Sequence, residues 1–494
     1  MAARGGAVTR LSLAALGGLG STRATLPPSR SRDDQVGIVH LGIGAFHRAH
    51  QAVFTEDAAV ATGEDGWGIC GATQRSAAVL EQLRPQDCLY SVLERGVGEP
   101  TLRVVGQVRD VLFAAEEPER LRSRLADPAT RVVTLTVTEK GYRRAPAGGL
   151  DLGDPTVKAD LAGDAGTAVG QLVWGLEARA RASGAPVSVL SCDNLTDNGH
   201  VLQHLVLDFC NALPSPRGDR LASWVEEHVS FPCSMVDRIV PSTTEADRVE
   251  AAALLGLTDE ALVVAEPFRQ WVVQDRFAAG RPAWERAGAD LVEDVRPYEA
   301  LKLRMLNGTH SLLAYLGALR GHDTIAEAVA DDELASAATS YLSEDAAPTL
   351  EAPPGQDPAA YGKQVLDRFA NPALRHRTRQ VGMDGSQKLP VRLLPTIAER
   401  LAVGAEPRWA TLAVAAWMTC LVADSDARGR PLALEDPLAD QLRAAVGGAS
   451  DPAAVVDRLL GVREVFDAEL AGSEVFRTML TEDVAMLLAG RVPR

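Results

Sequence analysis

Ile38-Val39-His40-Leu41-Gly42-Ile43-Gly44-Ala45-Phe46-His47 is the stretch that decides the fold. Its first four residues form a short apolar run that ends at a glycine, as a buried strand does. Gly42 permits a tight turn, and Gly44 lets the backbone approach a pyrophosphate at the N-terminus of the next helix. His47 stands where a dinucleotide-binding pattern has its third glycine. The stretch predicts a strand, a turn and a helix at a dinucleotide site, although a bare Gly-x-Gly is also typical of an ordinary turn.

Short β-rich runs alternate with helical stretches around this turn, over residues 36–290. Such alternation is typical of a mostly parallel sheet with helices on both faces. The further predicted strands are 67–70, 131–137, 187–191 and 262–265.

From about residue 295 the pattern changes to long Ala- and Leu-rich helical segments. The predicted helices are 297–320, 325–343 and 407–423, with a Pro/Gly-rich surface loop at 347–358. We therefore expect an α/β fold in two domains. An N-terminal Rossmann-like, doubly wound parallel sheet covers 36–294, a mostly α-helical domain covers 295–494, and residues 1–35 form an extension. Within the extension we expect a short amphipathic helix and a Pro/Ser/Arg linker at 26–34 rather than a signal peptide.

The bulk composition excludes several classes of partner. The net charge of -16 argues against nucleic acid, and no apolar run is long enough to span a membrane. Six scattered cysteines form no Cys-x-x-Cys pair, so neither a zinc site nor a disulfide framework is predicted, and reduced thiols fit the cytoplasm. We expect a cytoplasmic protein, monomeric or weakly oligomeric.

The choice of cofactor is open at the end of the second predicted strand. An acidic residue at this point usually binds the adenosine ribose of NAD, but residues 72–78 contain no carboxylate. Arg75 could neutralise the 2′-phosphate of NADP, or it could be a solvent-exposed loop arginine. NAD is the expected cofactor, and NADP is not excluded.

Lys302, Asn307 and His310 lie in a second informative stretch, which is otherwise apolar and is predicted to be helical. At about 100° per residue, Asn307 lies roughly 140° from Lys302 and His310 roughly 80° from it, so all three could face one cleft near the domain junction. A desolvated lysine there would have a lowered pKa and could accept a proton. Asn307 could hold one oxygen and His310 a second hydroxyl, which together make a metal-free set for oxidising an alcohol. Alternatively, the lysine and the histidine simply reach solvent.

Several motifs together resemble one family, the mannitol dehydrogenase family of long-chain polyol-specific dehydrogenases, which includes fructuronate reductase. The resemblance covers roughly residues 36–480. It is carried by 38–51, Thr138–Tyr142, Ser191–Asn194, Val229–Pro241 and Lys302–His310.

The resemblance implies a role for each matched residue. Lys302 would be the general base, Asn194 and Asn307 the amide pair on the reacting oxygen, and His310 the substrate-positioning histidine. Glu299 would connect the lysine to solvent. The implied cofactor contacts are Gly42, Gly44, Phe46, Thr138, Glu139, Lys140 and Asp237. The resemblance implies no catalytic metal.

Ordinary structural roles are also open for three of these residues. Asn194 could only form a turn, Asp237 could pair with Arg238, and Glu299 could favour a helix dipole. His200 and His204 have the i,i+4 spacing of a metal pair, but a surface or core role fits them better.

The substrate is predicted from the segment 374–388. Arg375, His376 and Arg377 form a basic cluster that would suit a carboxylate, with Lys388 a short distance further on. The segment looks closer to the fructuronate reductase branch than to the mannitol branch, although a solvated basic turn is also possible.

We therefore expect an NAD(P)-dependent dehydrogenase that interconverts a secondary alcohol of a linear polyol or hexonate with the matching ketose. The candidate pairs are D-mannitol/D-fructose and D-mannonate/D-fructuronate. The alternatives are an oxidative decarboxylase of a sugar acid and a catalytically silent nucleotide-binding paralogue.

Overall fold

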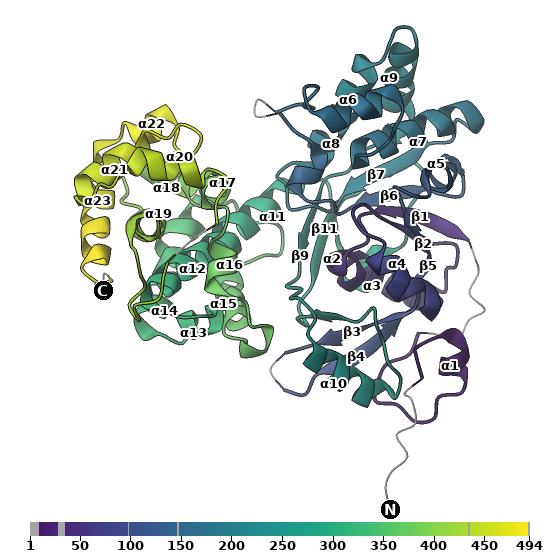
Figure 1. Ribbon diagram of the computed structural model, residues 1–494, viewed down its shortest axis with the longest axis horizontal. Helices are drawn as coiled ribbons and strands as arrows, with labels where there is room; N and C mark the ends of the chain where they lie inside the picture. Colours follow the sequence, from purple (N-terminus) through teal and green to yellow (C-terminus); the bar gives the residue numbers. More distant parts are fainter. Residues whose placement is uncertain (1–8, 28–34, 97, 146–147, 433–434, 493–494) are drawn as a thin grey trace, which may run out of the picture. The chain divides into compact units, whose positions relative to one another are not determined.

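The computed structural model describes residues 9–27, 35–96, 98–145, 148–432 and 435–492. The chain divides into two compact units, residues 1–296 and 297–494 (Figure 1). Among the described residues, no helix has both the length and the apolar character that are needed to cross a membrane.

A six-stranded parallel sheet forms the centre of the first unit, and its order is β5-β2-β1-β6-β7-β8. This is the order of a Rossmann fold, in which the chain reverses its direction of travel between β1 and β6 and leaves a crevice at the carboxyl ends of these strands. The predicted doubly wound parallel sheet is confirmed. Its strands are β1 (Val36–Leu41), β2 (Gly68–Thr73), β5 (Val108–Phe113), β6 (Val132–Leu135), β7 (Val187–Ser191) and β8 (Val229–Ser230).

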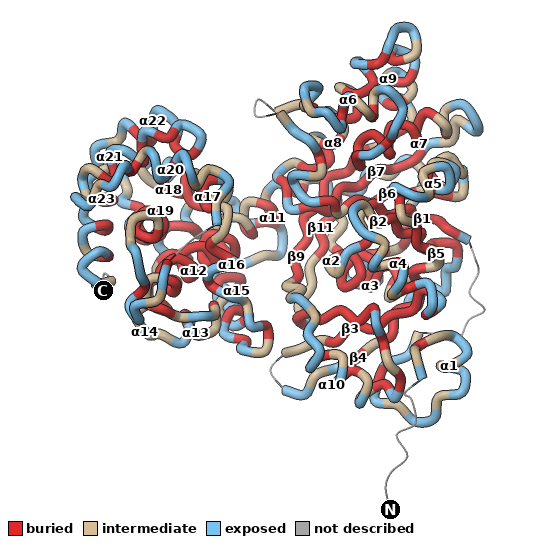
Figure 2. Tube along the Cα trace, in the orientation of Figure 1, coloured by how far each residue is buried: buried red, intermediate tan, exposed pale blue. Residues whose placement is uncertain are grey.

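The two faces of this sheet pack into separate cores because successive side chains of a strand point to opposite faces. Val39 and Leu41 of β1 belong to a core built with α5 (Pro118–Ala126), α7 (Ala168–Ala182) and α8 (Asn198–Ala212). Ile38 belongs to the other core, with α3 (Gln51–Thr62). The central strands are buried along their whole length (Figure 2).

Two three-stranded sheets complete the described part of the first unit, and they hold one predicted strand together with strands that were not predicted. The strand predicted at 262–265 exists as β10 (Val263–Ala265), but it pairs with β3 and not with the main sheet. A four-residue apolar run indicates a strand without specifying its neighbour. The first small sheet is β10, β3 (Tyr90–Glu94) and β4 (Thr101–Val105); the second is β12 (Asp290–Val292), β11 (Gln270–Gln274) and β9 (Ser234–Asp237).

The N-terminal extension packs on the first small sheet. A short helix, α1 (Leu13–Gly17), lies where one was predicted, and Leu11 is fully buried among residues of β3, β4 and α10 (Glu245–Leu255). Thr25 forms a parallel bridge with Arg103 of β4. Most of the predicted linker, residues 28–34, lies outside the described residues.

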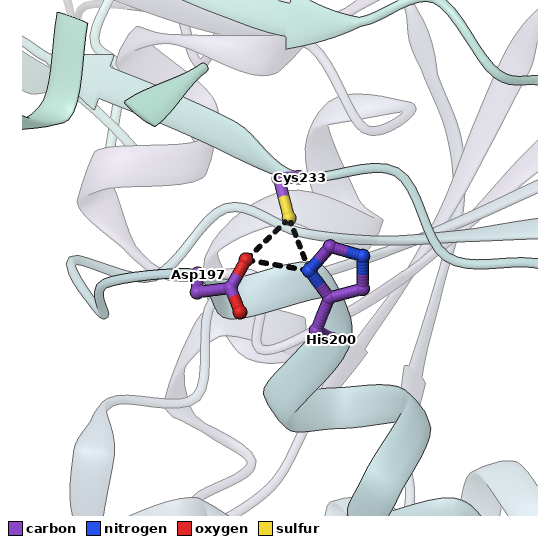
Figure 3. Close-up of side chains that lie close together, drawn as sticks. All are labelled: Asp197, His200 and Cys233. Atoms are coloured by element: carbon purple, nitrogen blue, oxygen red, sulfur yellow. Dashed lines mark hydrogen bonds and ion pairs between the residues drawn. The ribbon is translucent and has the colours of Figure 1, made fainter. Parts of the chain in front are cut away.

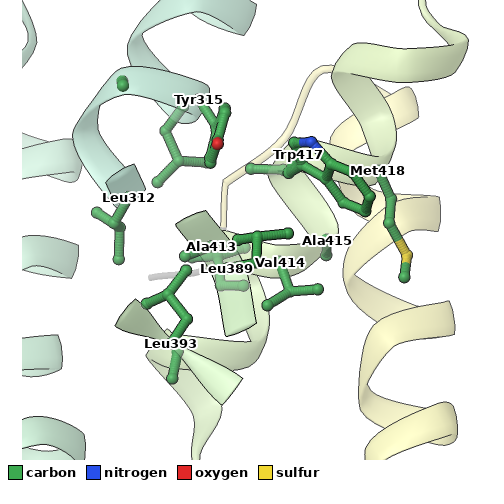
Figure 4. Close-up of a cluster of buried hydrophobic side chains, with 14 of the residues drawn as sticks. Leu312, Tyr315, Leu389, Leu393, Ala413, Val414, Ala415, Trp417 and Met418 are labelled. Carbon is green, nitrogen blue, oxygen red and sulfur yellow. The ribbon is translucent and has the colours of Figure 1, made fainter. Parts of the chain in front are cut away.

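The second unit is helical around two nearly fully buried helices, α12 (Gly308–Arg320) and α19 (Arg408–Val422). Their apolar side chains meet those of α17 (Gly385–Arg392), as Figure 4 shows for Leu312, Tyr315, Leu389 and Trp417. The other helices are α11 (Arg296–Leu301), α13 (Ile325–Val329), α14 (Asp332–Ser340), α15 (Pro358–Phe369), α16 (Thr378–Gly382), α18 (Leu394–Ala402), α20 (Ala439–Val446), α21 (Pro452–Leu460), α22 (Ala468–Ala471) and α23 (Glu474–Leu488).

Two of the three predicted helices are interrupted. The helix predicted at 297–320 contains a π-helical segment, η4 (Lys302–Asn307), between α11 and α12. The helix predicted at 325–343 ends early and restarts, because Asp331 caps the N-terminus of α14 with its side chain, and a second π segment, η5 (Tyr341–Ala346), follows. The helix predicted at 407–423 is confirmed as α19.

Candidate functional site

The turn after β1 has the geometry that its glycines predict. Gly42 has a φ of +98°, and a Cβ there would collide with the carbonyl of Thr136 after β6. Gly44 is exposed, and a Cβ on it would meet nothing nearer than the Gly42 carbonyl at 3.8 Å. The first glycine therefore allows two strand ends to approach, while the second keeps open backbone at the start of α2 (Ala45–Ala49), where Phe46 lies half-buried.

His47, at the position of the missing third glycine, fills space by stacking. Its ring lies 3.4 Å from that of His40, with the planes 14° apart. His40 in turn bonds the hydroxyls of Thr134 (2.7 Å) and Thr136 (2.9 Å). Burial lowers the pKa of His40 to about 3 and holds the pKa of His47 well below its usual range, so both rings are neutral at physiological pH. Two neutral histidines therefore connect β1, the β6 segment and α2 next to the turn.

The segment after β6 is strained and is held by a buried carboxylate. Thr138 has a φ of +69°, which is an unfavourable backbone conformation for a β-branched residue. Asp193, just after β7, accepts hydrogen bonds from the backbone N–H groups of Val137 (3.0 Å) and Thr138 (2.8 Å) and from the Tyr142 hydroxyl (2.7 Å). Thr138, Glu139 and Lys140 are exposed on this segment. The sequence did not indicate Asp193 as an anchor, because the groups that it holds lie more than 50 residues away in the chain.

Asn194 and Asp237 are brought to the same region of the first unit. Asn194 is exposed beside Asp193, and Asp237 is buried at the end of β9. The side chain of Asn198 connects their segments, since it donates to the Ser234 carbonyl (2.8 Å) and accepts from the Ser234 N–H (2.9 Å). Parallel strands end at one edge of a sheet, so the Gly42 turn, the Thr138 segment and Asn194 share the carboxyl edge of β1, β6 and β7.

Arg238 and Arg75 bear on two alternatives raised by the sequence: an ion pair of Asp237 with Arg238, and a contact of Arg75 with the 2′-phosphate of NADP. Arg238 pairs with Glu94 (2.5 Å) and also donates to the Glu266 carbonyl, so its structural role involves β3. Arg75 is exposed just beyond β2, and within the described residues its side chain has no hydrogen bond or ion pair. Arg75 is therefore available to a ligand, but nothing holds it in one place.

In the second unit, Lys302 and Asn307 are the first and last residues of η4 and both are buried. Each N–H of a π-helix bonds the carbonyl five residues back, so residues five apart lie about one turn apart on the same face. The predicted angle of roughly 140° between them is therefore wrong, because it assumed an α-helix. His310 lies three residues further on α12, which keeps it beside Asn307. Glu299 is buried in the first turn of α11.

A tyrosine from a distant helix accounts for the π register. The Tyr341 hydroxyl donates to the Arg304 carbonyl (2.6 Å), which an α-helix would pair with the N–H of Gly308. The Gly308 N–H bonds the Leu303 carbonyl, five residues back, instead. A Cβ on Gly308 would collide with the Tyr341 hydroxyl, so only glycine allows this approach. The tyrosine and the glycine together set the spacing of Lys302 and Asn307.

His310 and Asn307 are buried polar residues whose hydrogen-bonding capacity is only partly used within the described part of the chain. Asn307 Nδ2 and His310 Nε2 have no hydrogen-bond partner among the described residues. The His310 ring stacks on Phe369 at 4.5 Å and meets His376 edge-on at 4.7 Å. Burial first, then the charges of His376, Arg392, Lys388 and Arg368, hold the pKa of His310 well below its usual range. Buried polar atoms are normally paired, so the neutral imidazole and the primary amide each retain the capacity to form one more hydrogen bond.

The structure separates the four residues of the predicted substrate cluster. His376 and Lys388 lie near His310, and burial followed by the charge of Lys388 lowers the pKa of His376 to about 4. Arg375 and Arg377 are exposed and line an open cavity of about 1220 Å³. Lys302, Asn307 and His310 are not among the residues that line this cavity. Its other charged lining residues are Asp323, Glu327, Arg379 and Arg430.

His200 and His204 do not form a pair. His200 Nδ1 lies 2.5 Å from Asp197 Oδ1, and His204 Nε2 lies 3.5 Å from Asp208. The sulfur of Cys233 also approaches His200 Nδ1 (3.7 Å) and Asp197 Oδ1 (3.4 Å), which gathers three potential ligand types (Figure 3). Local spacing could not show this group, because Cys233 is distant in the sequence.

Comparison with known proteins bears directly on the predicted resemblance. The family profile described as the mannitol dehydrogenase Rossmann domain matches residues 36–286, and the mannitol dehydrogenase C-terminal domain matches residues 294–488. The D-mannonate oxidoreductase of Escherichia coli is 42% identical over 440 residues, which are 88% of this chain and 89% of the relative. The polyol:NADP oxidoreductase of Gluconobacter oxydans is 40% identical over 379 residues, which are 75% of this chain and 77% of the relative.

A solved structure agrees over nearly the whole chain. The mannitol 2-dehydrogenase of Pseudomonas fluorescens, in a ternary complex with NAD and D-mannitol, matches with a TM-score of 0.86 at 36% identity. The match covers 98% of this chain and 97% of that one. The resemblance is confirmed, and the chain belongs to the mannitol dehydrogenase family.

Proposed function

We propose that the protein is an NAD(P)-dependent dehydrogenase that interconverts a secondary carbinol of a linear polyol or hexonate with the corresponding ketone. The observation that carries this proposal is the set on η4 and α12. A buried lysine lies about one turn from an amide, and an imidazole follows; Asn307 Nδ2 and His310 Nε2 have no hydrogen-bond partner in the part of the chain that the structure describes. Relatives named for D-mannonate and mannitol support the same reaction class.

The roles follow from the chemistry of each side chain. Lys302 takes the proton of the reacting hydroxyl, and Glu299 passes it towards solvent. Asn307 and Asn194 hold the reacting oxygen as it gains negative charge. Neutral His310 bonds a neighbouring hydroxyl. The proposed substrate domain, 295–494, carries Lys302 and Asn307, and the proposed nucleotide domain, 36–294, carries Asn194.

Gly42, Gly44 and Phe46 would hold the dinucleotide at the turn, while Thr138, Glu139, Lys140 and Asp237 would contact its nicotinamide end. The exposed backbone at Gly44 fits a pyrophosphate, because no side chain occupies that space. When bound, the nicotinamide accepts or returns the hydride. Asp193 keeps the Thr138 segment in its strained conformation before the cofactor arrives. NAD is the proposed cofactor. The absence of an acid after β2 and the exposed Arg75 keep NADP open, and a polyol:NADP oxidoreductase is among the relatives.

We further propose that the physiological substrate is a sugar acid of the D-mannonate/D-fructuronate type, with D-mannitol as the second candidate. Three cationic side chains, Lys388, Arg392 and Arg368, act on His310 through their charges. A carboxylate next to His310 would experience this positive potential. In this proposal Lys388 binds the acid together with His376, whereas Arg375 and Arg377 line the open cavity described above and do not contact the acid.

A matched pair of variants tests this assignment. Wild-type protein is assayed with NAD and with NADP against mannonate, mannitol, arabinitol and sorbitol, by absorbance of the reduced nicotinamide. Lys388→Ala should raise KM for mannonate much more than KM for mannitol, and Arg375→Ala should change neither. No reduction of either cofactor with any of these substrates would rule out the proposed activity. Equal effects of Lys388→Ala on both substrates would remove the argument for a carboxylate.

The proposed setting is the cytoplasm, with a monomeric or weakly oligomeric state. The six cysteines all lie among the described residues, where they are buried and form no disulfide, which supports a reducing compartment.

A further inference from the structure

Asp197, His200 and Cys233 form a compact group in the first unit (Figure 3), and none of the three is among the residues proposed for catalysis. Their ligand atoms lie within 4.8 Å of one another. We propose that this group binds a single soft divalent cation of the Zn²⁺ type, with one sulfur, one nitrogen and one oxygen ligand. The argument for this site does not rest on the proposed dehydrogenase function.

The donor set and its distances suit such an ion. Thiolate, imidazole and carboxylate are the three side-chain ligands that zinc takes in proteins, and its usual bond lengths in a tetrahedron separate sulfur from the other ligands by about 3.6 Å. Cys233 Sγ lies 3.4 Å from Asp197 Oδ1 and 3.7 Å from His200 Nδ1. Asp197 and His200 share a hydrogen bond of 2.5 Å, so these two must separate by roughly 1 Å to accept the ion.

The exposure of the three side chains allows that movement and an entry path. The side chain of His200 is 52% exposed and that of Asp197 is 45% exposed, whereas Cys233 is buried. The two outer ligands can therefore adjust, while the sulfur is fixed at the base. Three protein ligands leave the fourth tetrahedral position to water from the exposed side.

The backbone that carries the ligands is already assembled. A Cβ on Gly199 would lie only 2.6 Å from the carbonyls of Phe231 and Pro232, so glycine lets the start of α8 approach the Cys233 segment closely. The two bonds between Asn198 and Ser234 join the residues directly next to Asp197 and Cys233. Binding would cost little conformational entropy, because both segments are already held in place before the ion arrives.

Binding would connect two segments that also carry proposed active-site residues. Asn194 precedes Asp197 on one segment, and Asp237 follows Cys233 on the other. The bound ion would therefore stabilise the loops that position these residues, without being a ligand to substrate.

Cobalt spectroscopy on the full chain tests the proposal. Chelator-treated protein titrated with Co²⁺ should develop a sulfur-to-cobalt charge-transfer band with one ion per chain, and added Zn²⁺ should abolish it. Cys233→Ser should lose this band, and His200→Ala should weaken binding roughly tenfold or more. His204→Ala is the matched control on the same helix and should bind as wild type.

Each contrary result has a clear meaning. A charge-transfer band that survives in Cys233→Ser, or no band at millimolar Co²⁺, would overturn the site. Equal losses in His204→Ala and His200→Ala would assign binding to the histidine pair instead. Cadmium NMR of the wild-type protein reports the number of thiolate ligands and needs no variant. A signal without a sulfur ligand would refute the proposal even if Cys233→Ser failed to fold.

Discussion

The proposed cofactor half and the proposed catalytic half hold their functional groups in different ways. In the first unit, exposed loop residues depend on buried side chains that bind backbone, as Asp193 does for Thr138. In the second unit, the groups are on a helix, and Tyr341 changes the register of that helix through one carbonyl. The hydrogen bond from Thr138 to Asp193 fixes the conformation of one loop. The hydrogen bond from Tyr341 sets the positions of all side chains on one turn of the helix. Loss of the tyrosine should therefore affect chemistry more than loss of a loop contact.

The largest expected effect is loss of the base in the helical half. Lys302→Ala should lower kcat by roughly 10²–10⁴-fold, because a positioned general base contributes about that much. The circular dichroism spectrum should be unchanged, and added primary amine should restore part of the rate. Lys363→Ala, at an exposed position of α15, is the control. Turnover at the wild-type rate in Lys302→Ala would show that another group accepts the proton.

Two buried groups, Asp483 in the second unit and His40 in the first, change stability with pH in opposite directions. Burial, partly offset by Arg408, raises the pKa of Asp483 on α23 from 3.8 to about 7. The folded state therefore binds this proton more tightly than the unfolded state, and stability falls as pH rises from about 4 to about 7. His40 in the first unit has the opposite sign, since its lowered pKa makes stability fall as pH drops below 6.5.

Asp483→Asn should accordingly raise the free energy of unfolding at about pH 8.5 by on the order of 2–4 kcal/mol, with a much smaller change at about pH 4. Urea denaturation at both pH values measures this, and hydrogen exchange of α19 and α23 locates it. A gain of equal size at both pH values would mean that ionisation of the Asp483 carboxyl does not cause the loss of stability at high pH.

Removal of the Tyr341 hydroxyl tests the origin of the π register. Tyr341→Phe frees the Arg304 carbonyl to pair with Gly308, so Lys302 and Asn307 should lose their alignment. We expect kcat to fall roughly tenfold or more and stability to fall by roughly 1–3 kcal/mol. Tyr315→Phe is the control, because the Tyr315 hydroxyl is buried without a partner among the described residues. A wild-type kcat in Tyr341→Phe would show that turnover does not depend on the hydrogen bond from Tyr341 to the Arg304 carbonyl.

The smallest expected effect is in the cofactor half. Thr138→Gly relieves the positive φ and should stabilise the protein by roughly 1 kcal/mol or less, while a looser segment raises KM for the dinucleotide. Thr138→Ala keeps a Cβ and should not be stabilised. If both variants have the same melting temperature, the conformation of Thr138 is not strained.

The parts of the protein that could be predicted from sequence are those encoded by local spacing. Apolar runs and the Gly42–Gly44 turn indicated β1, β2, β6 and β7 and their parallel sheet, because glycine placement and strand length are properties of adjacent residues. The identity of the family was likewise carried by short motifs in order. The chemistry of Lys302, Asn307 and His310, their spacing on a predicted helix and their motif indicated a site, but the angle between Lys302 and Asn307 depended on the π register.

The tertiary structure decided what depends on contacts between distant residues. Tyr341 changes the helix that carries Lys302, Asp193 holds Thr138, and Cys233 completes a ligand set with His200. Neither the partner of β10 nor the separation of His376 from Arg375 follows from the local pattern. A hydrogen bond or a collision between segments far apart in the chain leaves no periodic signal, so only the folded molecule reveals it.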